Sequence, residues 1–96
     1  MPAITPIKSF ERNFVANNGY KYNLKVVSKH PNHYDFDCMS VTDKGYVQAA
    51  YKDVVNNLKK NEYIESINNV INKIKSACSD NKLIQDLTDF MFKTVG

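Results

Sequence analysis

The sequence has no tryptophan, two cysteines, three glycines and one arginine among its 96 residues. Three glycines leave no room for a phosphate-cradling loop or a dinucleotide fingerprint, and no serine, histidine and aspartate arrangement typical of a nucleophilic enzyme occurs. We therefore expect neither enzymatic activity nor a cofactor. Cys38 and Cys78, without a basic and then apolar leader, predict reduced thiols and a cytoplasmic protein. No run of about 18 apolar residues is present, so we predict no membrane span.

Charge and composition bound the class of protein further. The length predicts a single domain over residues 1–96, and residues 1–6, with two prolines, predict an extended and mobile lead-in. The net charge is +3, and residues 1–34 hold five basic residues and one acid. Twelve lysines and twelve asparagines indicate an AT-rich coding genome. Such a genome is typical of a low-GC bacterium or a virus, and we predict an origin in a phage or mobile element.

Alternation of apolar and polar residues predicts two strands, over residues 20–29 and 34–41. The connecting turn contains His30, Pro31, Asn32 and His33. A two-residue loop would place polar and apolar side chains on the same face of the sheet, because a slip by one residue moves every side chain to the opposite face. The pattern therefore predicts a three-residue loop over 31–33. The expected partners are Val26 with Cys38, Ser28 with Phe36, and Lys29 with Asp35.

A further strand is predicted over residues 7–16, joined to the next by a hairpin turn. Asn17, Asn18 and Gly19 are a strong hairpin signal, with Gly19 suited to a left-handed position. A three-residue loop there pairs Phe14 with Tyr22, Phe10 with Val26, Glu11 with Lys25, and Arg12 with Leu24. Even-numbered side chains from Phe10 to Cys38 should then share one buried, apolar face of the sheet. Arg12 is the exception, because it is a charged residue on that face.

The segment from residue 41 to 58 allows two interpretations. Asp43, Lys44 and Gly45 could close another hairpin and make residues 46–51 a fourth strand. Alternatively, Thr42 or Asp43 caps a helix. We favour the helix, because apolar residues follow with three- and four-residue spacing: Val47, Ala50, Tyr51, Val54, Val55 and Leu58.

Two more helices are predicted over residues 61–78 and 81–95 from their apolar stripes. The predicted fold is therefore α+β: a three-stranded antiparallel β-meander followed by two or three helices packed on one face. Two helices, each about 10 Å wide, would cover a sheet about 14 Å wide. A third helix would either pack on the other two or meet a second copy of the chain, and we predict a homodimer through helices 61–78 and 81–95.

Two groups of side chains could hold a metal ion. His30 and His33, with Cys38 or Asp35, offer zinc ligands, and Asp35, Asp37 and Asp43 offer magnesium ligands. An exposed turn and simple strand alternation explain these residues better, and no second ligand pair has suitable spacing. We therefore predict no metal site, and we interpret Cys38 and Cys78 as packing residues.

The polar surface leads to two functional hypotheses. The first is a non-enzymatic protein-binding module, a stoichiometric regulator or inhibitor of a host or cognate protein complex. The alternative is a nucleic-acid-binding protein that uses the basic face of the sheet. The candidate partner-binding residues are Arg12, Asn18, Tyr20, Lys21, Asn23, Lys25, Lys29, His30 and His33.

Overall fold

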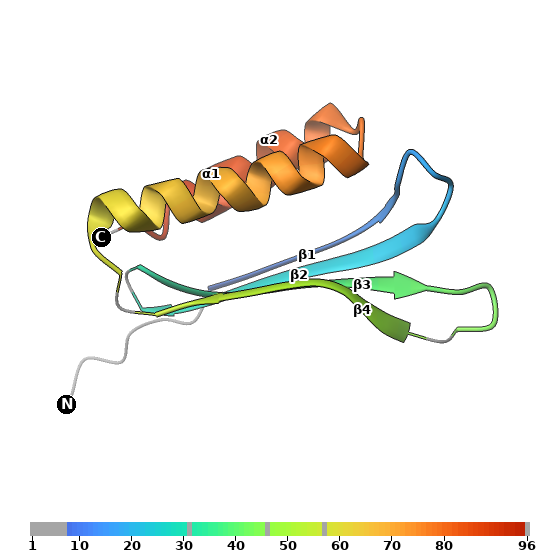
Figure 1. The fold of residues 1–96 in the computed structure, drawn as a ribbon, viewed down its shortest axis with the longest axis horizontal. Helices are drawn as coiled ribbons and strands as arrows, with labels where there is room; N and C mark the ends of the chain where they lie inside the picture. Colours follow the sequence, from blue (N-terminus) through green and yellow to red (C-terminus); the bar gives the residue numbers. More distant parts are fainter. Residues whose placement is uncertain (1–7, 31, 46, 57, 96) are drawn as a thin grey trace.

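A four-stranded antiparallel sheet lies beneath two helices in the computed structural model (Figure 1). The structure describes residues 8–30, 32–45, 47–56 and 58–95, so the predicted lead-in over 1–6 lies outside the described residues. The strands are adjacent in chain order, and both helices lie on one face, which we call the covered face; the opposite one is the open face. The elements are β1 (Lys8–Val15), β2 (Lys21–His30), β3 (His33–Val41), β4 (Val47–Val55), α1 (Lys60–Ala77) and α2 (Asn81–Phe92).

The first hairpin has the predicted register. Phe14 lies opposite Tyr22 and Phe10 opposite Val26, while Arg12 is paired with Leu24. The turn closes where the Gly19 amide donates to the Ala16 carbonyl at 2.9 Å, and Gly19 has a φ of 86°. Glycine adopts this left-handed backbone without steric cost, which is why the NNG signal located the turn correctly.

The second hairpin keeps the predicted faces but not the predicted register. Val26 lies opposite Phe36 rather than Cys38, because His30 pairs with His33, which makes the loop one residue shorter than predicted, and a bulge then shifts the register by one more residue. A β-bulge compensates for the shorter loop: β2 has one extra residue between Val27 and His30. An extra residue restores the alternation that a two-residue loop would otherwise invert. Asn32 has a φ of 60°, a left-handed backbone conformation that asparagine adopts more readily than most residues.

The favoured helix over residues 41–58 is wrong, since Val47–Val55 forms β4. The Gly45 amide donates to the Thr42 carbonyl at 2.8 Å and closes the hairpin that was the alternative interpretation. A bulge at Ala50 explains the misleading pattern, because Cys38 pairs with Tyr51 while Met39 pairs with Ala49. The extra residue converts two-residue alternation into a spacing that resembles a helical stripe. The sheet therefore has four strands and the described chain has two helices.

The helical stripes predicted over 61–78 and 81–95 are buried in one core with the covered face. Four strands span about 19 Å and two helices about 20 Å, so the layers match without a surplus helix. The reason for predicting a dimer through these helices therefore no longer holds, although the oligomeric state itself stays a prediction. The core residues supplied by the helices are Tyr63, Ile67, Val70, Ile71, Ile74, Leu83, Ile84, Leu87 and Met91.

Candidate functional site

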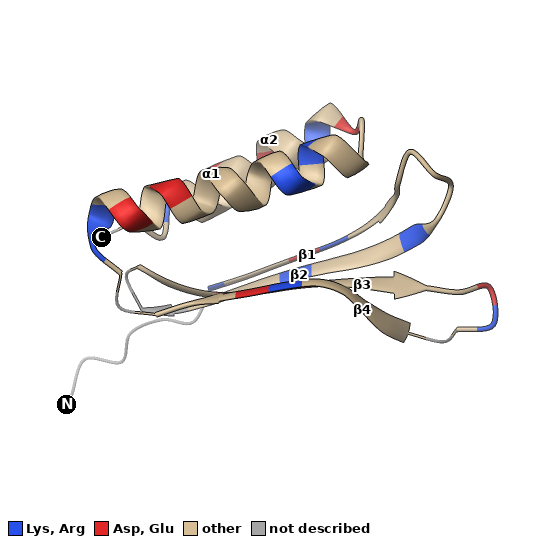
Figure 2. Cartoon of the chain, viewed as in Figure 1, with Lys and Arg blue, Asp and Glu red and all other residues tan. Residues whose placement is uncertain are grey.

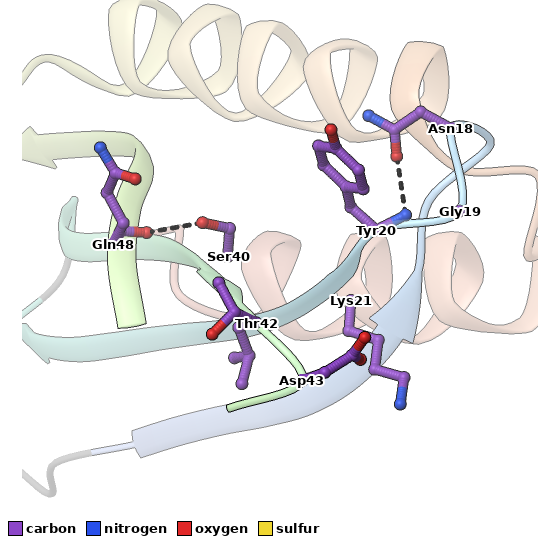
Figure 3. A pocket seen from close by; sticks show the side chains of 9 residues that line it. Asn18, Gly19, Tyr20, Lys21, Ser40, Thr42, Asp43 and Gln48 are labelled. Carbon is purple, nitrogen blue, oxygen red and sulfur yellow. Dashed lines mark hydrogen bonds between the residues drawn. The ribbon is translucent and has the colours of Figure 1, made fainter. Parts of the chain in front are cut away.

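Two hairpin turns lie at the same end of the sheet, which we call the hairpin end (Figure 1). One turn spans residues 16–19 and joins β1 to β2, and the other spans 42–45 and joins β3 to β4. Between them is a hollow of about 620 Å³ (Figure 3). Its walls come from both turns and the adjoining strand ends: Asn18, Gly19, Tyr20, Lys21, Ser40, Val41, Thr42, Asp43 and Gln48.

The turn before β2 is held rigidly by hydrogen bonds of its own. The Ala16 amide donates to the Tyr20 carbonyl at 2.9 Å, closing the base of the turn. The Asn18 side-chain oxygen accepts from the Tyr20 amide at 3.0 Å. This is the local bonding that favours asparagine in turns. These bonds therefore fix the backbone of Tyr20 where the chain leaves the turn.

The same turn is also tied to the helical layer through Asn17. Its amide donates to the Ala77 carbonyl at the end of α1, at 2.8 Å. Its side-chain oxygen accepts from the Ser79 hydroxyl at 2.9 Å. These two bonds join the turn to the connection between α1 and α2, so this side of the rim of the hollow is held by the fold itself.

Among the described residues of this end, Tyr20 is the most exposed aromatic side chain, with 64% of its surface accessible. Figure 3 shows its ring at one side of the hollow, with Thr42 and Asp43 at the other. The far wall is fixed by the Ser40 hydroxyl, which donates to the Gln48 carbonyl at 3.3 Å. An exposed tyrosine surrounded by hydroxyl, amide and charged groups is the composition of protein-binding surfaces.

The structure brings three of the nine candidate residues together at the hairpin end: Asn18, Tyr20 and Lys21. Asn23 and Lys25 lie on the open face, where the Asn23 amide donates to the Asn13 side chain at 2.8 Å. The side chains of Lys29 and His30 lie outside the described residues. The nine residues therefore do not form one site.

The remaining two candidates are engaged within the fold. Arg12 projects from edge strand β1 toward α2, where its guanidinium lies 2.7 Å from Asp86 and over the Phe10 ring. His33 lies at the end of the sheet opposite the hairpin end, with its Nδ1 atom 2.9 Å from the Asn56 side-chain oxygen. Both contacts stabilise packing between elements.

The metal-ligand hypotheses gain no support from the geometry. Among the described residues, no three histidine, cysteine, aspartate or glutamate side chains are grouped around a common point. Asp37 lies 3.7 Å from Lys52, whereas Asp43 belongs to the turn at the hairpin end. Cys38 is buried in the core, and burial raises the pKa of its thiol, so it is a weak nucleophile at neutral pH.

Sequence reasoning missed the far wall of the hollow, which Ser40, Thr42 and Gln48 provide. It assigned β4 to a helix and so could not place the second turn beside the first. The signal was present in the chain: Asn17-Asn18-Gly19-Tyr20 and Asp43-Lys44-Gly45-Tyr46 share one turn pattern. Two such hairpins, separated by two strands of a meander, must turn at the same end.

Neither described helix combines the length and apolar character needed to cross a membrane. Comparison of the chain with protein-family models, curated protein sequences and solved structures finds no match.

Proposed function

We propose that this chain is a non-enzymatic module that binds a host or cognate protein through its hairpin end and regulates or inhibits it by stoichiometric occupancy. The observation that supports this proposal is the exposure of Tyr20, which has 64% of its surface accessible at the rim of a hollow of about 620 Å³. A partner that covers this ring would bury apolar surface that the described fold leaves in water. The lysine- and asparagine-rich composition extends the proposal to a phage or mobile-element origin.

Preorganisation supports the same proposal. A partner that binds a loose turn must first order it, and this cost subtracts from affinity. Here the hydrogen bonds around Asn17 and Asn18 have already ordered the turn. Binding through Tyr20 would therefore spend little free energy on ordering the backbone. Tyrosine adds large contact area with few rotatable bonds, which is why it is enriched among interface hot spots.

Charge distribution favours a protein partner over nucleic acid. Lys25, in the middle of the open face, is paired with Glu11 on one side and Asp37 on the other. The two carboxylates oppose the phosphate attraction that Lys25 would provide. Figure 2 shows basic and acidic positions intermixed on the sheet rather than a stripe of one sign. The nucleic-acid alternative therefore ranks second.

A pull-down from the source organism with the wild type, Tyr20→Ala and Asn68→Ala, each with and without nuclease, tests the proposal. Asn68 is an exposed position on α1, far along the chain from the turn, and serves as the matched control. We expect the wild type and Asn68→Ala to recover one protein at equal stoichiometry, unaffected by nuclease. Tyr20→Ala should bind the recovered protein at least about tenfold more weakly.

Two results would contradict the proposal. Loss of the recovered protein after nuclease treatment would favour the nucleic-acid alternative. Equal affinity of Tyr20→Ala and the wild type for the recovered protein would move the binding site away from the hairpin end.

A further inference from the structure

The open face has a row of four charged residues of alternating sign. Glu11, Lys25, Asp37 and Lys52 occupy directly paired positions on β1, β2, β3 and β4. The Lys52 amine lies 3.7 Å from the Asp37 carboxylate. The row therefore reads negative, positive, negative, positive from one edge of the sheet to the other.

Aliphatic side chains lie on both sides of this charged row, on the same face. Val27 and Val54 each pair with Asp35 on one side, and Met39 and Val41 lie on the other. Val54 is 66% exposed. No described element covers this face, which Figure 1 shows turned away from the helices. The open face thus carries both apolar and charged residues, and a non-obligate interface as a whole is about as apolar as the rest of a protein surface.

We propose that the open face binds the open face of a second copy of this chain, with the strands of the two sheets aligned. A two-fold axis parallel to the strands, placed between the two faces, reverses the order of the charged row in the second copy. Glu11 then lies opposite the second copy's Lys52, and Lys25 opposite its Asp37. Every carboxylate meets an amine.

The charge order selects this arrangement over the other face-to-face one. A two-fold axis along the row would place each charge over its own copy, which repels at all four positions. Aligned sheets in sandwiches cross at about 30°, and strands are about 4.8 Å apart. The outer pairs would shift by about 4 Å under this rotation, while the central Lys25 and Asp37 pairs would shift by about 1 Å. The central pairs therefore provide most of the specificity.

The available area predicts a weak dimer. Four strands of about eight residues cover roughly 19 by 26 Å, so the complex would bury about 1,000 Å² in total. This value is near the lower limit for a specific interface. We therefore expect association at high micromolar concentration that weakens as salt is added.

Sedimentation equilibrium of the full chain at 10 µM to 1 mM tests the inference with a charge exchange at the central pair. Lys25→Glu alone would oppose Asp37 of the second copy, and Asp37→Lys alone would oppose its Lys25. We expect each single variant to be monomeric over the range in which the wild type dimerises. An equimolar mixture of the two should dimerise, because each central pair then joins opposite charges again.

The double variant Lys25→Glu/Asp37→Lys is the folding control, since it restores the pair within the chain as well as between chains. We expect it to dimerise within about threefold of the wild type. A wild type that is monomeric at 1 mM and 50 mM salt overturns the inference. A wild-type dimer whose dissociation constant is unchanged in both single variants also overturns it. Such a result would place the contact on another surface, such as the helices.

Duplex DNA, used as a second probe, separates this inference from a polyanion site on the same face. A polyanion should bind Lys25→Glu more weakly and Asp37→Lys more tightly than the wild type. Such opposite changes, with no dimer, would overturn the inference. The test does not involve Tyr20, so it can fail while the proposed function stands, and the reverse is equally true.

Discussion

The Tyr34 hydroxyl lies 2.5 Å from a carboxylate oxygen of Asp53, and this contact joins two neighbouring strands beneath the first helix. The same hydroxyl lies 2.5 Å from the Ser66 hydroxyl on α1. Because a carboxylate only accepts, the Tyr34 proton goes to Asp53 and Ser66 donates to Tyr34. Burial and the neighbouring carboxylate raise the pKa of Tyr34 far above its usual range, so the hydroxyl stays a donor. One side chain thus links β3, β4 and α1.

Removing this hydroxyl should destabilise the fold. In Tyr34→Phe, Asp53 and Ser66 lose their shared partner within the covered face, and we expect a loss of about 1–3 kcal/mol in unfolding free energy. Urea denaturation followed by circular dichroism measures it. Tyr51→Phe is the matched control: Tyr51 is half-buried on the same face, and its change should be below about 0.5 kcal/mol. Equal midpoints for Tyr34→Phe and the wild type would contradict the prediction.

The contact between Arg12 and Asp86 predicts a pH dependence. The hydrogen bond from Arg12 lowers the pKa of Asp86, and Lys82, 3.6 Å away, acts in the same direction. A carboxyl group with a lowered folded-state pKa stabilises the fold above its unfolded value, and this contribution is lost as the pH falls through the folded value. Asp86→Asn should therefore unfold at lower urea concentration than the wild type at pH 7. The difference should shrink below about pH 4.

Asp89→Asn serves as the control for that experiment, because Asp89 is an exposed aspartate on the same helix. Its unfolding midpoint should follow that of the wild type across the pH range. A difference between Asp86→Asn and the wild type that stays constant down to pH 2 would show that the ion pair is not the cause.

Burial of both thiols predicts slow chemical modification. Cys38 is 4% exposed and Cys78 is 3% exposed, and burial raises the pKa of Cys38, which lowers its thiolate fraction. A disulfide reagent at pH 8 should react with the native chain at least roughly 100-fold more slowly than with the chain in urea. Asn72→Cys places a thiol on an exposed position of α1 and should react in the native state at close to the unfolded rate. Rapid native reaction of the unmodified chain would contradict the prediction.

Local sequence was sufficient where one turn and two alternating strands determined the structure. The register of β1 with β2 followed from Asn17, Asn18 and Gly19 together with the even-numbered apolar residues. The predicted buried face is also correct in β2 and β3, since Leu24 and Phe36 are both fully buried. In each case only the even-numbered side chains could face the core, because a one-residue slip would bury the lysines instead.

Bulges limited what the sequence could predict. Between Val27 and His30, an extra residue keeps the apolar side chains on the covered face despite the shorter loop. At Ala50, another extra residue interrupts the alternation of β4. At the first bulge the Ser28 hydroxyl donates to the His33 carbonyl at 2.9 Å, a contact that exists only after the strands pair. This limit also affects the candidate site. The sequence identified Tyr20 and its neighbours, but the opposite wall of the hollow could not be predicted without β4.

The shared turn pattern at the hairpin end gives the last prediction. Gly19 has a φ of 86° and Gly45 a φ of 83°, and a Cβ at either position would meet no atom within 4 Å. Space is therefore not the constraint, and the cost of a side chain is torsional. Gly19→Ala and Gly45→Ala should each lose about 1–2 kcal/mol in unfolding free energy. Urea denaturation of the two variants measures this loss.

Asparagine at the same positions distinguishes backbone strain from other causes, because it visits left-handed conformations more readily than alanine. We expect Gly19→Asn and Gly45→Asn to recover about half of the stability lost in the alanine variants. If alanine is tolerated as well as glycine, the two turns are not held in the left-handed form. The hollow between them would then lose the fixed rim on which the proposed binding depends. If asparagine and alanine lose equally, a cause other than the sign of φ must be sought at these turns.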